Sequence, residues 1–390
     1  MSVETITLGC RLNFAESATI ARSAPADEDW IVVNSCAVTN EAVRQTRQAI
    51  RRAHREQPYA RILVTGCAAE LQPDSFASLP GVSRVVGNPG KLSALAANDV
   101  MAPAGLLANV KSFVAVQAGC DHRCTFCSIW QARGPSISLP FEAIRDAVAR
   151  EIDRGAKEVV LTGVDITDYA GGLGNLCQRL LAAEPRLKRL RLSSLDSIEI
   201  DETLFELIAG EARLMPHFHL SLQAGDDMIL KRMKRRHSRD EAVRTVERIK
   251  AARPDATIGA DLIAGFPTET EEMALNSLEL LDDCDIVAAH IFPFSPRPDT
   301  PAERMPQLAP ELVKARAARL RDAAAGRRSR WLESLVDSTQ PILVEGAGKG
   351  HTDNFAPVAI AGAERGETGR ARITSFGGAQ LTAEFVDLGA

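Results

Sequence analysis

Hydrophobic and polar positions alternate in a regular way over the first ninety residues. Short apolar runs, typical of buried strands, are separated by longer stretches with a helical period. The clearest helix covers residues 40–56, and Asn40 is its predicted N-cap. Strand–helix alternation of this kind predicts a parallel α/β domain over residues 1–90. Its predicted strands are residues 3–8, 30–34, 62–65 and 83–86.

A second alternating region follows a break. Asn88-Pro89-Gly90 interrupts the first pattern, and the Ala-, Gly- and Asn-rich stretch 91–110 is typical of a linker. Residues 111–335 then supply six strand–helix units, which predict an incomplete (βα)6 barrel or an open sheet. The predicted strands are residues 113–117, 158–162, 189–193, 219–223, 257–264 and 286–292. Helices fit between them, for example residues 141–154, 240–252 and 269–282.

The last part of the chain changes character again. A Pro-rich exit leads into a basic helix that begins at Pro310 and ends near Ser334. Residues 336–390 then show short apolar runs separated by Gly-rich turns, a pattern that predicts a small β-barrel. These runs are residues 342–345, 356–360, 370–374 and 381–386.

Composition narrows the class of protein. The chain has 390 residues, of which 45% are hydrophobic and 25% charged, so it is neither disordered, collagen-like nor a coiled coil. The net charge is −5, so no global basic field marks a nucleic-acid binder. No signal peptide is expected at the start, and polar residues interrupt the most apolar window, 92–110, so no membrane association is expected. Eight cysteines are too few for a secreted disulfide scaffold and favour a reducing, cytoplasmic compartment.

Three cysteines form the strongest chemical signal in the chain. Cys120, Cys124 and Cys127 make a C-x3-C-x2-C pattern directly after a predicted barrel strand. Three thiolates from one loop can hold three irons of a 4Fe–4S cluster and leave the fourth iron open to a ligand. The alternative is a zinc site completed by His122. Placement at the carboxyl end of a barrel strand favours the iron–sulfur cluster.

A second set of cysteines is spread over the N-terminal domain. Cys10, Cys36 and Cys67 each follow one of the first three predicted strands, with separations of 26 and 31 residues. Since open α/β sheets bind ligands at the carboxyl ends of their strands, the three thiols can converge on a second cluster. The alternative is three unrelated buried cysteines. Cys177 and Cys284 are predicted to be core residues.

At these residues the chain resembles the radical S-adenosylmethionine (SAM) enzymes, and specifically the tRNA methylthiotransferases. The opening motifs of that family are similar to Leu8-Gly-Cys-Arg-Leu-Asn13, Val33-Asn-Ser-Cys-Ala-Val-Thr39 and Val64-Thr-Gly-Cys67. Its radical motif is similar to Gly119-Cys-Asp-His-Arg-Cys-Thr-Phe-Cys127 followed by Ala132-Arg-Gly134. Later signatures resemble His219-Leu-Ser-Leu-Gln223, Met233-Lys-Arg235 and Gly265-Phe-Pro-Thr-Glu269. Gly350-His-Thr-Asp-Asn354 resembles the start of the family's C-terminal RNA-binding barrel, of the TRAM type.

Two segments look most like the branch that acts on N6-threonylcarbamoyladenosine in tRNA, Asn34-Ser-Cys-Ala-Val-Thr39 and His351-Thr-Asp-Asn-Phe355. The resemblance implies attachment of a methylthio group to C2 of adenosine 37, beside the anticodon. It also implies two 4Fe–4S clusters, one that cleaves SAM to a 5′-deoxyadenosyl radical and one that carries or supplies the sulfur. A second SAM donates the methyl group, and the implied partners are the tRNA anticodon stem–loop, a one-electron reductant and a sulfur donor.

The chain departs from the family pattern in two places beside the radical cysteines. It has Pro135-Ser-Ile-Ser138 where the family usually has an Arg, and Ser128-Ile-Trp130 where the family commonly has Ile-Ile-Pro. Neither departure touches the six cysteines. Both concern the expected contacts to the substrate.

The expected chemistry needs no acid–base residues, so none is nominated as catalytic. An aromatic C–H has no acidic proton, and the radical chemistry belongs to the cofactor. Gly163, Ser193, Ser194 and Gln223 fall at the carboxyl ends of predicted strands and are expected to contact the adenosyl group. The alternative is that they are turn residues without a ligand.

Three basic stretches are candidates for RNA contact. Residues 228–253 carry ten Lys/Arg against three Asp/Glu, and residues 311–333 carry seven against three. The helix after Asn40 places Arg44, Arg47, Arg51 and Arg55 along one stripe. Charge runs are often only solvated faces, and the expected enzyme chemistry favours residues 231–239. Aromatic residues are sparse, so backbone contacts are expected more than base stacking.

Other functions stay open at this point. The same chemistry could act on isopentenyl-adenosine in tRNA or on an aspartate of a ribosomal protein. A non-catalytic iron–sulfur carrier would not cleave SAM, and metal analysis would identify a zinc-stabilised RNA-binding module.

Overall fold

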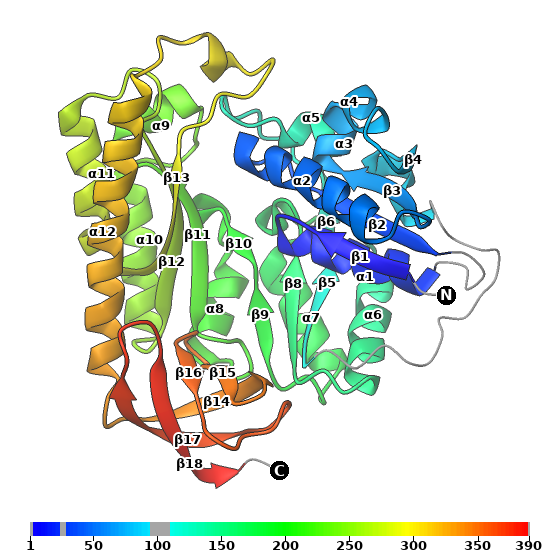
Figure 1. Cartoon of the computed structure of the whole chain (residues 1–390). Helices are drawn as coiled ribbons and strands as arrows, with labels where there is room; N and C mark the ends of the chain where they lie inside the picture. The colour runs from blue at the N-terminus through cyan, green and yellow to red at the C-terminus, as the bar shows by residue number, and fades with distance from the viewer. Residues whose placement is uncertain (1–2, 24–28, 94–109, 389–390) are drawn as a thin grey trace.

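The computed structural model describes residues 3–23, 29–93 and 110–388, and these form three packed bodies. Figure 1 shows an N-terminal α/β layer, a larger curved α/β body beside it and a small β-barrel at one end. Within the described residues, no helix is both long and apolar enough to span a bilayer.

The N-terminal body is a parallel four-stranded sheet in the order β1-β2-β3-β4. Its central strands are buried, apart from the first residue of the third strand, and rich in branched apolar residues, as is typical of parallel sheets. The strands are β1 (Val3–Thr7), β2 (Trp30–Ser35), β3 (Arg61–Gly66) and β4 (Val82–Val85). The helices are α1 (Arg11–Ser23), α2 (Asn40–Glu56), α3 (Cys67–Leu71) and α4 (Pro73–Ala77), followed by the 3-10 helix η1 (Asn88–Ser93).

The cap of helix α2 differs from the prediction. Thr39, not Asn40, is the N-cap: its backbone is extended, and its hydroxyl accepts a hydrogen bond from the Ala42 N–H at 3.0 Å. Asn40 is the first helical residue, and its side chain points to a different partner. Its Nδ2 donates to the Pro296 carbonyl at 3.3 Å, across the boundary between two bodies.

The second body is a partial barrel made from two neighbouring sheets of parallel strands. The first sheet has the order β5-β8-β9 and the second the order β10-β11-β12-β13. The strands are β5 (Lys111–Ala115), β8 (Glu158–Thr162), β9 (Leu190–Leu192), β10 (Ser194–Leu195), β11 (His217–Gln223), β12 (Thr257–Ala264) and β13 (Ile286–Pro293). Six strand positions were predicted; the third, residues 189–193, contains β9, and the additional strand β10 follows directly after Ser193.

The first predicted barrel strand also ends early. Strand β5 stops at Ala115, and β6 (Gln117–Ala118) pairs antiparallel with β7 (Ile137–Ser138) instead of continuing the barrel. The reason is that the Gln117 side chain turns inward, where its Oε1 accepts hydrogen bonds from the N–H groups of Val164 and Asp165.

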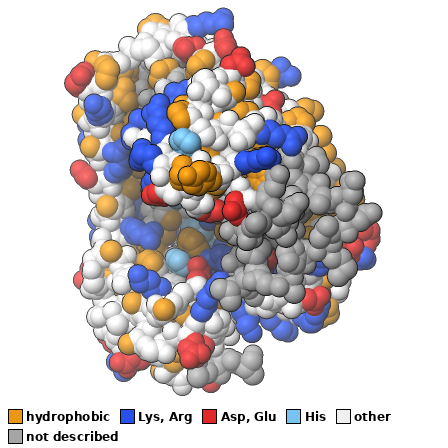
Figure 2. Space-filling view, turned by 45° about the vertical axis from the view of Figure 1, so that its right-hand side comes forward, with side chains coloured by type: hydrophobic (Ala, Val, Ile, Leu, Met, Phe, Trp, Pro, Cys, Tyr) orange, Lys and Arg blue, Asp and Glu red, His pale blue; other side chains and the backbone are white. Residues whose placement is uncertain are grey.

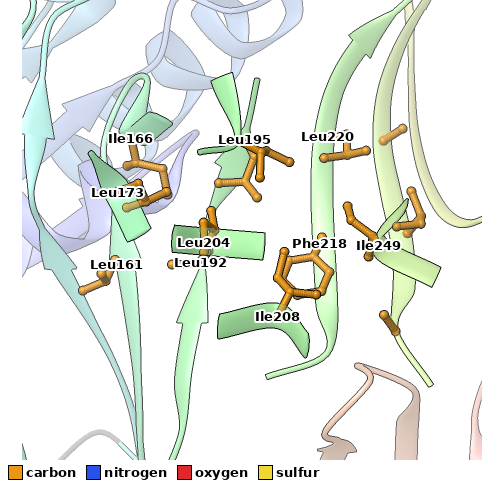
Figure 3. Close-up of a cluster of buried hydrophobic side chains, with 14 of the residues drawn as sticks. Leu161, Ile166, Leu173, Leu192, Leu195, Leu204, Ile208, Phe218, Leu220 and Ile249 are labelled. Carbon is orange, nitrogen blue, oxygen red and sulfur yellow. The ribbon is translucent and has the colours of Figure 1, made fainter. Parts of the chain in front are cut away.

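Helices cover the outside of the partial barrel. They are α6 (Phe141–Asp153), α7 (Leu173–Ala183), α8 (Glu202–Gly210), α10 (Arg239–Ala252), α11 (Glu271–Asp283) and α12 (Pro310–Ser334), with 3-10 turns η2 (Ile166–Asp168), η3 (Ser197–Glu199) and η4 (Pro301–Arg304). Helix α5 (Ile129–Arg133) packs instead against α3 of the N-terminal body, and α9 (Asp227–Met233) contacts the loop that contains Thr125. Helix α11 begins two residues later than predicted because Thr270 caps it. Figure 3 shows the core, in which strand residues such as Leu161, Leu192 and Leu220 face helix residues such as Leu204 and Ile249.

The third body is a closed barrel in the strand order β14-β15-β16-β18-β17. Its strands are β14 (Thr339–Gly346), β15 (Lys349–Thr352), β16 (Pro357–Ala359), β17 (Thr368–Phe376) and β18 (Leu381–Leu388). The sequence analysis missed β15, because Lys349-Gly-His-Thr has no apolar alternation. The segment 350–354 therefore lies on the second strand and the turn after it, not at the start of the barrel.

That same turn docks the small barrel against the amino ends of the partial barrel's strands. Phe355 stacks on His217 of β11, with ring centroids 4.9 Å apart, and its ring also lies under the charge of Arg191. The Thr257 hydroxyl donates to the Asn354 carbonyl at 2.7 Å, and Arg189 pairs with Asp353. The small barrel thus sits at the end of the strands opposite to the cysteine loop (Figure 1).

Candidate metal and cofactor site

The loop with Cys120, Cys124 and Cys127 follows β6 and is fixed at both ends. Gly119 has φ +78°, and a side chain there would come within 1.8 Å of the Pro135 carbonyl, so only glycine lets the loop turn. The Cys120 N–H donates to the Gly134 carbonyl at 3.1 Å. The loop is therefore held in a form that brings its thiols together.

The tip of this loop is tied to helix α9. The Thr125 N–H donates to the Met233 carbonyl at 3.0 Å, and the Thr125 hydroxyl donates to the Arg232 carbonyl at 2.7 Å. Arg235 also approaches the loop: its Nη1 lies 3.8 Å from the Cys124 Sγ. The segment 233–235, singled out by its family resemblance, thus supports the loop with Cys120, Cys124 and Cys127. This loop is called the radical loop below, after the motif that it resembles.

The His122 ring contacts carboxylates beside the loop. Its Nε2 lies 2.8 Å from an Asp165 carboxylate oxygen and 3.6 Å from a Glu199 oxygen. The ring is thus engaged by carboxylates beside the loop. For the zinc alternative, the other ring nitrogen, Nδ1, would have to complete the metal site, because Nε2 is engaged by carboxylates.

The second cysteine set was predicted from the strand pattern, and its role as a cluster site stays a prediction. Cys10, Cys36 and Cys67 lie at the carboxyl ends of β1, β2 and β3, and the charge of each thiolate would act on the others. Gly9 makes this approach possible: at φ +93°, a side chain there would come within 2.6 Å of the Cys36 Sγ. The three thiols form a donor set suited to three irons of a cluster.

The thiols of both sets are protonated when no metal is bound. Burial raises the pKa of Cys36 to about 11 and that of Cys120 to about 12. Without metal these thiols are neutral at physiological pH, and binding iron must displace their protons. All eight cysteines are free thiols, and Cys177 and Cys284 are buried in the core as predicted.

A buried cation supports the second cysteine set. Arg133, the last residue of α5, donates from Nε to the Cys67 Sγ at 3.2 Å and from Nη2 to Asn13 Oδ1 at 2.6 Å. Its Nη1 pairs with Glu16, and Lys91 pairs with the same carboxylate. These are long-range contacts between α5, which follows the loop with Cys120, Cys124 and Cys127, and α1 of the N-terminal body.

The two cysteine sets are neighbours in space. The thiolate charges of Cys127 and Cys67 are close enough to act on each other, although they belong to different bodies. Arg297, in the Pro-rich exit, is close enough for its charge to act on Cys36 and on Cys127. A group placed between the sets would therefore contact both.

The predicted adenosyl contacts all lie at the carboxyl edge of the partial barrel. Gly163 follows β8, and a side chain there would come within 2.8 Å of the Gln117 carbonyl, so the position demands glycine for packing. Ser193 and Ser194 mark the break between β9 and β10, and Gln223 ends β11 with φ 69°. The side chains of these last three make no hydrogen bond within the described residues. They stay predicted contacts.

The barrel interior below this edge holds a polar group that the sequence analysis did not identify. His219 and His290 both lie against one oxygen of Asp261, at 2.9 and 3.1 Å. The charge of Arg11, the residue after Cys10, acts on Asp261 from the N-terminal body. The N-terminal body therefore lies near the open side of the barrel at Asp261, while His290 stays exposed.

Most charges of the basic stretch 228–253 are engaged within the protein. Arg239, Arg248 and Lys250 form ion pairs with carboxylates, and Arg253 donates to the Leu214 carbonyl at 2.6 Å. Figure 2 shows one face of the molecule hollowed between two lobes, with Lys and Arg side chains bordering the hollow.

Two lysines of this stretch differ from the engaged residues. Lys231 and Lys234 are exposed, and neither forms an ion pair within the part of the chain that the structure describes. In helix α2, Arg44 pairs with Glu41 while Arg47 covers the Phe76 ring, so the predicted stripe is partly structural.

The sequence analysis missed the buried supports of the cysteine sets. Arg133 stood in a quoted motif, but no pattern linked it to Glu16, 117 positions away, or linked Glu16 to Lys91, 75 positions away. A usable signal was the presence of Asn13 and Glu16 one helical turn apart directly after Cys10.

Comparisons with known proteins agree with this geometry. The family model of the radical SAM superfamily matches residues 114–281, and that of the uncharacterized protein family UPF0004 matches residues 2–87. The threonylcarbamoyladenosine tRNA methylthiotransferase MtaB of Rickettsia prowazekii is 41% identical over 90% of each chain. A protein of the same name from Thermotoga maritima is 31% identical over 88% of this chain and 86% of its own.

A second kind of relative is also similar over most of the chain. The tRNA-2-methylthio-N(6)-dimethylallyladenosine synthase of Erythrobacter litoralis is 32% identical over 88% of this chain and 86% of its own length. Among solved structures, the radical SAM methyltransferase TsrM of Kitasatospora setae matches with a TM-score of 0.54 at 15% identity, covering 74% of this chain and 66% of that one. This likeness concerns the fold alone.

Proposed function

The chain belongs to the methylthiotransferase family of radical SAM enzymes, and from this premise we propose its substrate and its cofactor count. It attaches a methylthio group to C2 of N6-threonylcarbamoyladenosine at position 37 of tRNA. It does so with SAM and two 4Fe–4S clusters, one on each cysteine set. The substrate follows the names of the relatives at 41%, 31% and 34% identity.

The observation that carries the proposal is the closeness of two separate cysteine sets. A single cluster and SAM suffice to generate a radical, but sulfur insertion also needs a place that holds sulfur near the reacting carbon. Cys10, Cys36 and Cys67 offer such a place, next to the radical loop across the boundary between bodies. The residues of the chain bind, orient and shield these groups, while the bound clusters and SAM supply the radical chemistry.

Two residues would hold the radical loop in register during this reaction. Thr125 fixes the tip of the loop to α9, and Arg235 places a cation beside Cys124. Gly163, Ser193, Ser194 and Gln223 line the edge where the adenosyl group would lie. Their tests are substitutions that weaken SAM binding without a loss of iron.

The tRNA would span the height of the partial barrel. The small barrel sits at the amino ends of the strands and the cysteines at the carboxyl ends. Strand β12 has eight residues, so these ends are about 26 Å apart. An anticodon stem–loop held by the small barrel would reach the cysteines along the open side of the partial barrel, past Lys231 and Lys234. We also infer a cytoplasmic location, a one-electron reductant and a sulfur donor, as the chemistry requires.

The test is nucleoside analysis of tRNA. Deletion of the gene is expected to remove 2-methylthio-N6-threonylcarbamoyladenosine from total tRNA, and the purified, reconstituted enzyme is expected to restore it on the deletion tRNA. Loss of 2-methylthio-dimethylallyladenosine instead would favour the second candidate function. That candidate is supported by the 32% identical relative from Erythrobacter litoralis.

Cleavage of SAM distinguishes the proposed enzyme from a different class of protein, the non-catalytic iron–sulfur carriers. A non-catalytic iron–sulfur carrier would produce no 5′-deoxyadenosine when reduced with SAM. The proposed enzyme is expected to release 5′-deoxyadenosine under the same conditions. Without tRNA, this release is expected to be slow but measurable.

A further inference from the structure

Arg297 is a buried arginine with hydrogen-bond donors left over. It is 5% exposed, and its Nη1 donates to Asn40 Oδ1 at 2.7 Å. Its Nε and Nη2 are also buried, and neither has a hydrogen-bond partner among the described residues. Buried polar groups in native proteins are nearly always paired, so two open donors on one guanidinium need an explanation. They point to a ligand that the side chain is built to hold.

The charge of Arg297 is unbalanced as well. No carboxylate forms an ion pair with it in the described part of the chain, and burial lowers its pKa. The groups whose charges act on it are the thiols of Cys36 and Cys127, one from each cysteine set. A buried cation without a counter-ion is costly, and an anion bound between the two sets would remove that cost.

The backbone holds Arg297 in place for such a role. The N–H and the hydroxyl of Thr300 both donate to the Arg297 carbonyl, at 3.2 and 2.8 Å. Asn40 grips the same segment from the N-terminal body, through the Arg297 guanidinium and the Pro296 carbonyl. The side chain is thus positioned from both bodies before any ligand arrives.

Arg133 shows what a purely structural arginine looks like in the same region. Its Nε, Nη1 and Nη2 all have partners, and Glu16 balances its charge. Both arginines approach a cysteine of the N-terminal set, but only Arg297 keeps open donors. Arg133 therefore joins two bodies of the protein, whereas Arg297 has donors left to bind a ligand.

We propose that Arg297 is a positioning residue that holds the anionic sulfur group carried by the N-terminal cysteine set, turned toward the radical loop. The inference rests on the proposed function. A sulfide or thiolate is anionic and accepts N–H hydrogen bonds, as the open face of the guanidinium requires. Two other anions are available, the carboxylates of SAM and of the threonylcarbamoyl group. S-adenosylhomocysteine occupies the place of the first in the experiment below, and the second is attached through N6, whereas C2 is the atom that must meet the sulfur.

The experiment uses methanethiolate as the probe, on full-length chains reconstituted without oxygen. Iron and sulfide are counted first, and the reduced clusters are then titrated with methanethiolate and followed by electron paramagnetic resonance. S-adenosylhomocysteine is present throughout to occupy the radical loop. The variants are Arg297→Gln and Arg297→Lys. The control is Arg327→Gln, an arginine paired with Asp282 and Asp285 at the far end of β13.

We expect all four proteins to hold about eight irons. Arg297→Gln is expected to weaken methanethiolate binding by about tenfold or more, the size of one charge-assisted hydrogen bond, and Arg297→Lys by about threefold. Arg327→Gln is expected to bind as the wild type does. If Arg297→Gln loses iron, Arg297→Lys carries the test, and binding equal to the wild type would overturn the proposal.

Two other outcomes also overturn it. If Arg297→Gln binds methanethiolate normally but no longer prefers an anticodon stem–loop with threonylcarbamoyladenosine over one with adenosine, the residue reads the substrate carboxylate. If the wild-type chain holds only about four irons, the two-cluster function itself fails, and the iron count shows this before any thiolate is added.

Discussion

The two cysteine sets are built in opposite ways. Cys120, Cys124 and Cys127 lie in one short loop, which a nearby contact to Gly134 and a contact to α9, 107 positions along the chain, hold in place. The N-terminal set is collected from three strand ends and depends on a correctly registered sheet and on Arg133 from another body. A local motif can form its site almost independently, whereas a site gathered by topology is sensitive to distant changes.

The largest expected effect is on the reaction products, because each cysteine set is expected to serve a different step. Replacing Cys10, Cys36 and Cys67 together with Ala is expected to abolish the methylthio product, because no sulfur-holding site remains. Cleavage of SAM to 5′-deoxyadenosine is expected to persist, since the radical loop does not need that set to form. Both products are measured by liquid chromatography and mass spectrometry. Cys177→Ala, a core change, serves as the control, and methylthio product from the triple variant would contradict the account.

The next effect tests how far the N-terminal set depends on its support. Arg133→Met removes the cation that pairs with Glu16 and leaves a buried carboxylate with Lys91 alone. We expect a loss of about 3 kcal/mol in unfolding free energy, measured by urea denaturation of the metal-free protein. The exposed Arg44→Met, which breaks a surface pair with Glu41, is expected to cost less than about 1 kcal/mol. Equal losses of unfolding free energy in the two variants would show that Arg133 contributes no more to stability than an exposed ion pair does.

A smaller effect is expected at the opposite end of the barrel. Phe355→Ala removes the stacking on His217 and the contact with Arg191, for a loss of about 2 kcal/mol. Because this contact lies far from both cysteine sets, iron content is expected to stay unchanged. Thermal unfolding measures the first quantity, and chemical iron analysis the second. A variant that loses iron would show that the sets are less independent of the small barrel than their placement indicates.

The same contact gives the stability a pH dependence. Burial, together with the charge of Arg191, lowers the pKa of His217 well below 6.5. The folded ring stays neutral while the unfolded one takes up a proton, so this contribution is complete above about pH 6.5 and is lost as the pH falls below it. The melting temperature of the metal-free protein between pH 8 and pH 5 is expected to fall more steeply for wild type than for His217→Gln. Parallel curves would contradict this.

The smallest effect concerns RNA. Lys231 and Lys234 are exposed on the segment that buttresses the radical loop, so their double replacement by Ala is expected to lower the salt slope of tRNA binding by about 1.5. Filter binding at several salt concentrations measures the slope. Lys250→Ala, which breaks a pair with Asp285, is expected to leave it unchanged. If the salt slope changes in Lys250→Ala and not in the Lys231/Lys234 double variant, the RNA does not bind along the segment with Lys231 and Lys234.

The difference between the sets also explains what the sequence could predict. The apolar runs placed β8, β12 and α2 at their observed bounds, because burial sets both the pattern and the element. The strand period also predicted that Cys10, Cys36 and Cys67 would meet. It missed β15, whose residues have no apolar alternation, and it misplaced the cap of α2, because Asn40 serves a contact to Arg297 that is local in space and not in sequence.

Long-range polar partners were beyond reach for the same physical reason. Arg133 with Glu16, and Arg297 with Asn40, join residues 117 and 257 positions apart. No periodicity links such pairs, because each depends on how two bodies dock. The supports of the site therefore had to come from the structure, while the thiols themselves carried a signal in their spacing.

The central claim is that each cysteine set holds its own cluster, and iron counting tests it most directly. The measurement is iron and sulfide per chain after reconstitution without oxygen, for wild type and for the Cys120/Cys124/Cys127→Ala triple variant. We predict about eight irons in wild type and about four in the variant, as two three-cysteine clusters require. About four irons in wild type and none in the variant would contradict the account, because Cys10, Cys36 and Cys67 would then bind no cluster.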